Sequence, residues 1–418
     1  MSSNTWYRVD NVAKVFLASY NKRDTRSFRV SVTLNEEIEP GLLDIAVKQA
    51  LTLRPQYQVV IHKGLFWHYM DHTDEEPVVT EEDDRPCPTL YGPSMNGRLH
   101  FKVSYRYNRI NLEMFHALTD GNGGVEFLNL ILLKYLNLAY PGKLNEVSFP
   151  SEATENDLSE DSFKQFYEKD GKFLKASRMK KAYNVRGLKL PNDQLQFFEV
   201  HMSASPLLKL AKENGATLTS YLCARLMLAI RKDMPLLQRL RPVTISMPVN
   251  LRNFYDSQTS RNFFNSVYVS HVFSKDISAK ELSEECDLKL KAELTPEKIK
   301  KRMNNYEKIE RLLFVRMVPL FIKNPVVALS SMIESRGVTA VISNLGRLKL
   351  PEELKPYVES YAAYCSHSKV FITCVSYEDE FVMGIASGYR NTAFLRDFIS
   401  GFAKDGIDIK LYATDVAE

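Results

Sequence analysis

The residues of this chain best suited to chemistry are His116 and Asp120, which lie in the segment FHALTDGNGG. An unperturbed imidazole has a pKa of about 6.5, so a histidine can accept a proton near neutral pH. The chain has only 8 histidines, and chance would give about 0.02 matches to His-x-x-x-Asp-Gly in such a composition. The pattern therefore predicts a general base, and the alternative is a core histidine beside a structural aspartate.

The elements around His116 place it at the end of a strand. Leu99–Tyr107 alternates between apolar and polar residues, Asn108–Arg109 suits a turn, and residues 110–114 alternate again, which predicts a hairpin. Val125–Tyr140 carries a broad apolar stripe typical of a buried helix. His116 would then be held rigidly yet be reachable from a cleft. Three glycines, Gly121, Gly123 and Gly124, are expected to permit unusual backbone angles in the turn.

The rest of the chain predicts a layered α/β or α+β protein with more than one domain. Its 418 residues exceed a usual single core. Strands are expected at 28–34, 57–63, 65–69, 195–202, 243–250, 266–273, 339–342, 370–377, 381–386 and 407–412. Helices are expected at 40–53, 205–214, 219–231, 297–309 and 394–403. Ser151–Pro191 is polar and without periodicity, which predicts an irregular arm and a connection between domains.

Charge and composition exclude several classes of function. A net charge of +4 gives no reason to expect a nucleic-acid partner. The five cysteines and the remaining histidines lack metal-ligand spacing, so we expect reduced thiols, no metal site and a cytoplasmic protein without a signal peptide. The apolar stretch Leu312–Ile333 contains two prolines and two basic residues, which argues against a spanning helix. Residues 297–311 predict a solvated helix or, alternatively, a basic surface for an anionic lipid or coenzyme A phosphates.

Several motifs together resemble the CoA-dependent acyltransferase superfamily that shares HxxxDG, which includes chloramphenicol acetyltransferase and condensation domains. Besides FHALTDGNGG, the resemblance rests on KGLFW at 63–67, MPVNLR at 247–252 followed by RNF at 261–263, and ISNLG at 342–346. It implies a mixed-sheet α+β sandwich of two chloramphenicol-acetyltransferase-like subdomains, residues 1–185 and 186–418. These would form a pseudodimer with a tunnel between them.

The resemblance also implies roles for individual residues. His116 would act as the general base, Asp120 would be structural and paired with Arg252, and Gly121 would leave room for the substrate beside the imidazole. The oxyanion of a tetrahedral intermediate would be stabilised by a residue among Ser343, Asn344 and Asn250; the alternative for SNLG is a turn with local side-chain caps. No cofactor would be bound. An acyl-CoA thioester would be the co-substrate, and a small alcohol or a lipid would be the acceptor.

Two departures narrow the resemblance to the alcohol acetyltransferase-like branch. Phe115 stands where condensation domains usually have a second histidine, and the DFGWG motif of plant-type acyltransferases is missing. Free acyl-CoA is therefore favoured over a thioester on a carrier protein. Two alternatives stay open, namely a condensation-type acyltransferase that depends on a carrier protein and a non-catalytic binding protein on the same fold.

Overall fold

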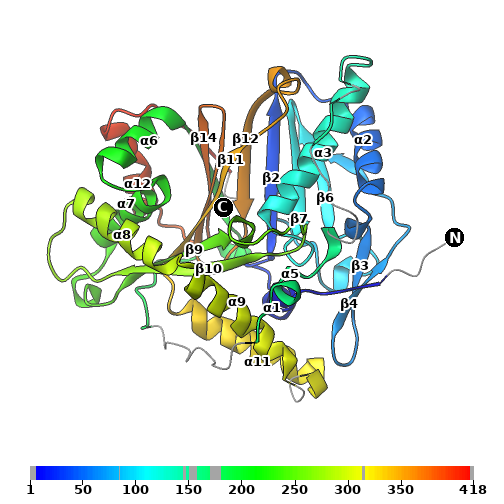
Figure 1. Ribbon diagram of the computed structural model, residues 1–418. Helices are drawn as coiled ribbons and strands as arrows, with labels where there is room; N and C mark the ends of the chain where they lie inside the picture. Colours follow the sequence, from blue (N-terminus) through cyan, green and yellow to red (C-terminus); the bar gives the residue numbers. More distant parts are fainter. Residues whose placement is uncertain are drawn as a thin grey trace.

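The computed structural model describes residues 6–83, 85–144, 147–149, 158–169, 180–312 and 316–414. Two sheets lie face to face, and each carries helices on its outer side (Figure 1). This is the mixed α/β architecture that the sequence predicts. Both sheets contribute to one large apolar core, and the second half of the chain has a further core under its own helices.

The first sheet has five strands in the order β12-β2-β7-β6-β5, and β5 is its single parallel member. The strands are β2 (Ser27–Leu34), β5 (Val79–Glu81), β6 (Phe101–Arg106), β7 (Arg109–Phe115) and β12 (Val358–Cys365). Helices α2 (Pro40–Thr52) and α3 (Gly121–Ala139) pack on each other and on this sheet. The turn between β6 and β7 is at Tyr107–Asn108, one residue earlier than expected, and Tyr107 has a φ of 52°.

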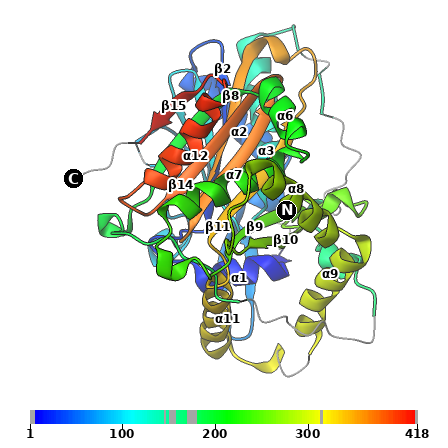
Figure 2. The same cartoon turned by 90° about the vertical axis from the view of Figure 1, so that its left-hand side faces the viewer.

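The second sheet has seven strands in the order β10-β9-β11-β13-β14-β8-β15, and β11 runs parallel to both of its neighbours. The strands are β8 (Gln196–Ser203), β9 (Val243–Asn250), β10 (Phe264–His271), β11 (Ala340–Leu348), β13 (Val370–Tyr377), β14 (Glu380–Ser387) and β15 (Lys410–Ala413). Its outer face carries α6 (Ala204–Glu213), α7 (Leu218–Asp233), α8 (Ala279–Glu293) and α12 (Ala393–Lys404) (Figure 2).

One strand from the second half of the sequence belongs to the first sheet. Strand β12 pairs antiparallel with β2 and also contacts β13 and β14 across the interface between the sheets. Gly384 in β14 makes this approach possible, because a Cβ there would lie 1.9 Å from the carbonyl oxygen of Ala363. A second link is the ion pair between Arg109 on β7 and Glu199 on β8. The division into residues 1–185 and 186–418 stays a prediction, and the two sheets do not follow it strictly.

A smaller group of elements lies at one end of the molecule, at the bottom of Figure 1. It contains a three-stranded sheet in the order β1-β4-β3 and four helices. These elements are β1 (Trp6–Arg8), β3 (Val59–Lys63), β4 (His68–His72), α1 (Asn11–Ser19), α5 (Ser162–Gln165), α9 (Pro296–Arg311) and α11 (Leu320–Ser335). Among the described residues there are also six 3₁₀ turns: η1 (Pro55–Tyr57), η2 (Pro93–Met95), η3 (Pro191–Asp193), η4 (Leu236–Gln238), η5 (Leu251–Asn253) and η6 (Lys355–Tyr357).

Some elements differ from those expected. Helices α1, α5, α8 and α11 and strands β1, β5 and β12 were not predicted, and much of the expected arm at 151–191 lies outside the described residues. The SNLG segment belongs to the long strand β11, whose pairing is irregular between Asn344 and Arg347, and Gly346 there has a φ of 80°. In the part of the chain that the structure describes, no helix has the length and apolar character needed to cross a bilayer.

Candidate active site

His116 directly follows strand β7, and its side chain lies among three phenylalanine rings. The backbone N–H of His116 donates to the carbonyl of Arg26, which holds the turn against the start of β2. The imidazole centroid is 4.5 Å from Phe16, 5.0 Å from Phe28 and 5.8 Å from Phe264. These apolar rings desolvate the imidazole, and burial lowers the pKa of His116, although the charge of Asp120 acts in the opposite direction.

Asn262 orients the imidazole. Its Oδ1 lies 3.0 Å from His116 Nδ1, while its Nδ2 donates to the His116 carbonyl at 2.8 Å and to Asp10 Oδ2 at 3.2 Å. Since Nδ2 is directed to two acceptors, Oδ1 must be the atom that faces the ring, and Nδ1 must carry the proton. The other ring nitrogen, Nε2, is then the basic one, and no described residue forms a hydrogen bond with it.

Asp10 completes this chain of hydrogen bonds. It is the N-cap of α1, where its Oδ1 accepts from the backbone N–H of Ala13 at 2.7 Å. Burial and the nearby Asp161 raise the pKa of Asp10 to about 6. The orientation of His116 therefore depends on a side chain close to the beginning of the chain and on another in its second half.

Asp120 is buried and serves as the N-cap of α3. Its Oδ1 accepts from the N–H of Gly123 at 3.2 Å, and its Oδ2 accepts from the N–H of Phe263 at 3.0 Å. The guanidinium of Arg252 donates to the same Oδ2 at 2.7 Å. Arg252 also donates to the carbonyls of Thr259 and Arg261. The pair thus ties the loop after η5 to the turn that carries His116.

The glycines after Asp120 are required for close packing, which corrects the expectation of unusual backbone angles. None of Gly121, Gly123 and Gly124 has a positive φ, and all three belong to the first turn of α3. A Cβ on Gly123 would lie 2.7 Å from the carbonyl oxygen of Ser260, and one on Gly121 would lie 2.8 Å from the side chain of Leu345. The space beside Gly121 is thus occupied by Leu345.

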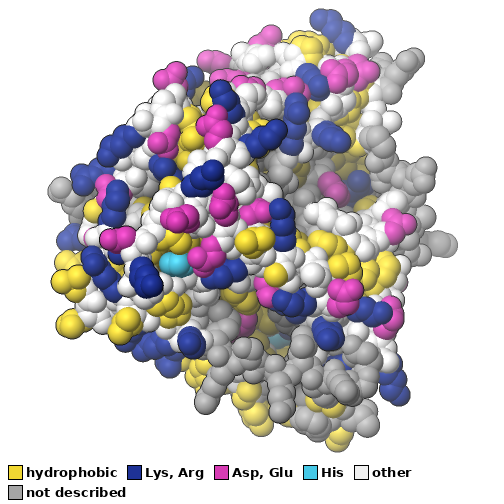
Figure 3. All heavy atoms as spheres, turned by 60° about the vertical axis from the view of Figure 1, so that its left-hand side comes forward, with side chains coloured by type: hydrophobic (Ala, Val, Ile, Leu, Met, Phe, Trp, Pro, Cys, Tyr) yellow, Lys and Arg dark blue, Asp and Glu magenta, His cyan; other side chains and the backbone are white. Residues whose placement is uncertain are grey.

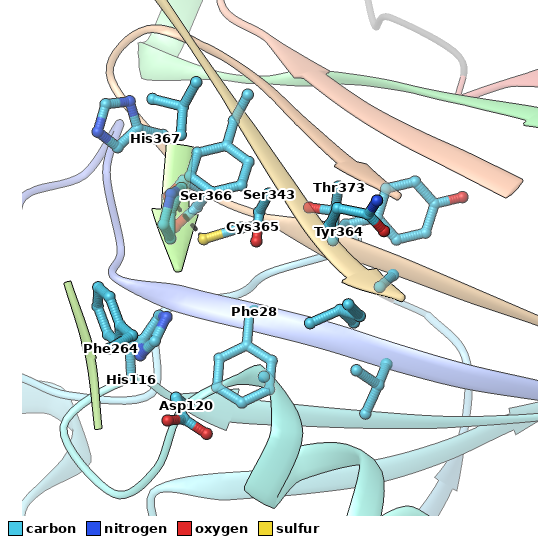
Figure 4. Close-up of a pocket in the computed structure, with 18 of the residues that line it drawn as sticks. Phe28, His116, Asp120, Phe264, Ser343, Tyr364, Cys365, Ser366, His367 and Thr373 are labelled. Carbon is cyan, nitrogen blue, oxygen red and sulfur yellow. Dashed lines mark hydrogen bonds between the residues drawn. The ribbon is translucent and has the colours of Figure 1, made fainter. Parts of the chain in front are cut away.

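A cavity of about 200 Å³ lies between the two sheets and is lined by His116. It draws residues from both halves of the chain, including Phe28 from β2, Ser343 from β11 and Thr373 from β13. Figure 4 shows His116 and Phe264 on one side of this space and Ser343 and Cys365 across from them. A tunnel open at both ends stays a prediction.

All three candidates for stabilising an oxyanion line this cavity, but they differ in their existing hydrogen bonds. Asn344 donates to Thr219 at 3.0 Å and accepts from the N–H of Gly346 at 2.9 Å. Asn250 accepts from Arg252 through its Oδ1. The hydroxyl of Ser343 and the Nδ2 amide group of Asn250 have no hydrogen-bond partner among the described residues, so these two donors are the most available to a ligand.

Several lining residues carry no signal in the sequence. Cys365 ends β12, which was not predicted, and Ser366 and His367 stand between β12 and β13. Asn262 lies in the RNF segment at 261–263, but nothing in the local sequence indicates that it contacts His116. Among the described residues, no group of three or more His, Cys, Asp or Glu side chains is arranged to hold a metal ion.

Comparisons with known proteins support the fold. No protein-family model matches the chain. A local match, 34% identical over 56 residues, is to a holo-[acyl-carrier-protein] synthase of Chlorobaculum tepidum, and it covers 13% of this chain and 43% of that protein. The chain therefore spans less than half the length of this relative.

Solved structures match over nearly the whole chain. The trichothecene 15-O-acetyltransferase TRI3 of Fusarium sporotrichioides is 12% identical, with a TM-score of 0.63 over 96% of each chain. TRI101 of F. graminearum, solved with coenzyme A and deoxynivalenol, is 10% identical, with a TM-score of 0.64 over 94% of this chain and 96% of that one. The starter condensation domain of rhizomide synthetase RzmA, solved with C8-CoA, is 11% identical, with a TM-score of 0.60 over 95% and 94%. The chain has the fold shared by CoA-dependent acetyltransferases and condensation domains.

Proposed function

We propose that this protein is an O-acyltransferase of the HxxxDG superfamily that moves an acyl group from an acyl-CoA thioester to an alcohol acceptor. The observation that carries the proposal is the orientation of His116. Its Nδ1 is held by Asn262, which leaves Nε2 as the basic nitrogen of a ring that lines the cavity between the sheets. An alcohol is a weak nucleophile until a positioned base removes its proton.

The proposed reaction needs no covalent enzyme intermediate. Nε2 of His116 takes the proton of the acceptor hydroxyl as the oxygen attacks the thioester carbonyl carbon. The carbonyl oxygen becomes an oxyanion, for which the Ser343 hydroxyl and the Asn250 amide are favoured as donors over Asn344, whose Nδ2 already donates to Thr219. When the intermediate collapses, the carbon–sulfur bond breaks, and the imidazolium gives its proton to the thiolate. The products are an ester and free coenzyme A.

The surrounding residues support these roles without touching the reacting atoms. The pair of Asp120 and Arg252 holds the turn that carries His116. Its position, buried and enclosed by backbone groups, fits the structural role that the resemblance implies. The proposed subdomains, 1–185 and 186–418, would each supply part of the site, because Asn262 and Ser343 come from the second and His116 from the first.

The test is an assay of thiol release with the purified protein, using several acyl-CoAs against a panel of alcohols, glycolipids and amines. We expect His116→Ala to abolish release while the protein still folds, as judged by circular dichroism. The matched control is His62→Ala, because the side chain of His62 is 46% exposed and lies outside the cavity. Full turnover in His116→Ala would refute the mechanism. Preference for an acylated carrier protein over acyl-CoA would replace the donor with the carrier-bound thioester.

A further inference from the structure

Helix α11 exposes most of its large apolar side chains, while the side that it turns toward the protein carries both polar and apolar residues. A surface helix normally buries its apolar stripe. In α11, which packs on α1, Leu320 is buried, and Lys323, Asn324, Val327 and Ala328 are partly buried. The opposite face is exposed and mostly apolar, with Phe321 65%, Val326 58% and Ile333 56% accessible, and the exposed Ser330 and Glu334 lie along one edge of it. So many exposed apolar side chains are unusual on a surface helix.

The tip of the β3–β4 hairpin extends the same apolar surface. Leu65 and Trp67 are 61% and 58% exposed. The tip is fixed beside the start of α11, because the N–H of Leu320 donates to the Leu65 carbonyl at 2.7 Å and Lys323 donates to the Phe66 carbonyl at 3.1 Å. We call the whole surface the apolar ridge. It consists of Leu65, Trp67, Met317, Phe321, Ile322, Val326, Leu329, Met332 and Ile333.

Basic residues border the apolar ridge. Of the four basic residues between positions 311 and 336, Arg311, Arg316 and Arg336 are exposed and Lys323 is partly buried; the one acidic residue there is Glu334. Lys63, at the base of the hairpin tip, is also exposed. Hydrophobic and basic side chains are both visible toward the lower end of the molecule in Figure 3, where Figure 1 places α9 and α11. Apolar side chains with a tryptophan, edged by Lys and Arg, are typical of helices that lie in the interface of an anionic bilayer.

We propose that the apolar ridge docks on the surface of a phospholipid bilayer, with α11 lying in the plane of the interface. At 16 residues α11 is roughly 24 Å long, and Lys323 lies within it, so it would rest on the membrane without crossing it. The main alternative is a second copy of this chain. A two-fold interface would bring the same basic border of each copy against the other, whereas an anionic leaflet complements it.

Docking in this manner would bring the cavity close to the leaflet. Helix α11 packs on α1, and Phe16 of α1 lines the cavity and contacts His116. Helix α1 therefore lies between α11, which carries most of the apolar ridge, and the candidate active site. The proposal itself rests on the surface alone and does not require that the protein be an acyltransferase.

The first experiment is co-sedimentation of the full chain with vesicles of phosphatidylcholine alone or mixed with phosphatidylglycerol. We expect binding to the mixed vesicles that weakens with added salt. The double variant Leu329→Glu/Ile333→Glu should lower it by roughly tenfold or more, because both side chains would carry charge into the interface. The matched control is Leu237→Glu/Leu240→Glu, two residues that are 98% and 81% exposed in the segment between α7 and β9. This control should bind as the unmodified chain does.

The second experiment uses Trp67 as a reporter. The chain has two tryptophans, so Trp6→Phe leaves Trp67 alone, and its emission should shift to the blue when mixed vesicles are added. Three results would overturn the proposal: no binding to either vesicle, equal binding by the ridge variant, or a dimer in light scattering that the ridge variant converts to monomer without any vesicle binding. These readouts are independent of catalysis, so they stand whether or not thiol release is observed.

Discussion

Replacing Asp120 with asparagine should destabilise the protein strongly although the side chain keeps its shape. The side chains of Asp120 and Arg252 are 4% and 12% exposed. Asparagine is as good an N-cap as aspartate, so the hydrogen bond from Gly123 should survive. What is lost is the charge that compensates Arg252. Removing one member of a buried pair costs about 3–5 kcal/mol, and we expect Asp120→Asn to lower the free energy of unfolding by that amount.

The assay is urea unfolding followed by circular dichroism, with the m value as a check that the same surface is exposed. The matched control is Glu213→Gln, which breaks an exposed ion pair with Lys209. The side chain of Lys209 is 80% accessible and that of Glu213 is 58% accessible. That change should cost no more than about 0.5 kcal/mol.

A double-mutant cycle distinguishes the ion pair from general disruption of the turn. The variant Asp120→Asn/Arg252→Met removes both charges, so its cost should fall short of the sum of the single costs by about 1 kcal/mol or more. A loss below about 1 kcal/mol for Asp120→Asn, or strictly additive costs, would refute the reasoning that a buried charge is left unpaired.

Three further predictions follow from the site and its supports. Asn262→Ala should lower kcat roughly tenfold or more and move the acidic limb of the pH–rate profile to lower pH, because its hydrogen bond raises the pKa of His116; an unmoved limb would contradict this. Gly384→Ala should lower the melting temperature far more than Gly121→Ala, because its Cβ would meet a backbone carbonyl and not a side-chain end. The pKa of His100 is lowered to about 4 by burial, so this residue should contribute about 3 kcal/mol to the fall in stability between pH 6.5 and 4, and His100→Gln should make that fall smaller.

Stability and activity should both fall as the pH is lowered, because both depend on a buried neutral histidine. A buried imidazole resists protonation, so its folded pKa lies below 6.5, and the neutral form persists as pH falls toward that value. His100 accepts from the N–H of Ile61 through Nε2 at 2.8 Å, and its Nδ1 lies 2.9 Å from the Leu90 carbonyl. A proton added to His100 Nε2 would face the N–H of Ile61, so two hydrogen-bond donors would point at each other. Activity that depends on neutral His116 should likewise be lost at acidic pH.

Local patterns in the sequence predict the elements around His116 well. The alternation before it and the apolar stripe after it involve residues that lie close together along the chain. Strand β12 was not predicted, because its partner β2 is more than three hundred residues away and only the folded chain brings them together. Helix α11 was missed for another reason. Its apolar face is exposed and Pro325 lies inside it, which contradicts both rules by which a surface helix is recognised.

The same distinction explains which site residues could be anticipated. His116 and Asp120 share one short motif. Asn262, in contrast, lies 146 residues from His116, which it contacts, and Asp10 lies 252 residues from Asn262, which it contacts. Neither has a local pattern that indicates a partner. Because the tautomer of His116 depends on both, the base exists only once the N-terminal segment, the first sheet and the second sheet have come together. The proposed chemistry therefore depends on the folding of the whole chain. Strand β12 shows the same dependence in the backbone, because it comes from the second half of the sequence and pairs with β2 in the first sheet.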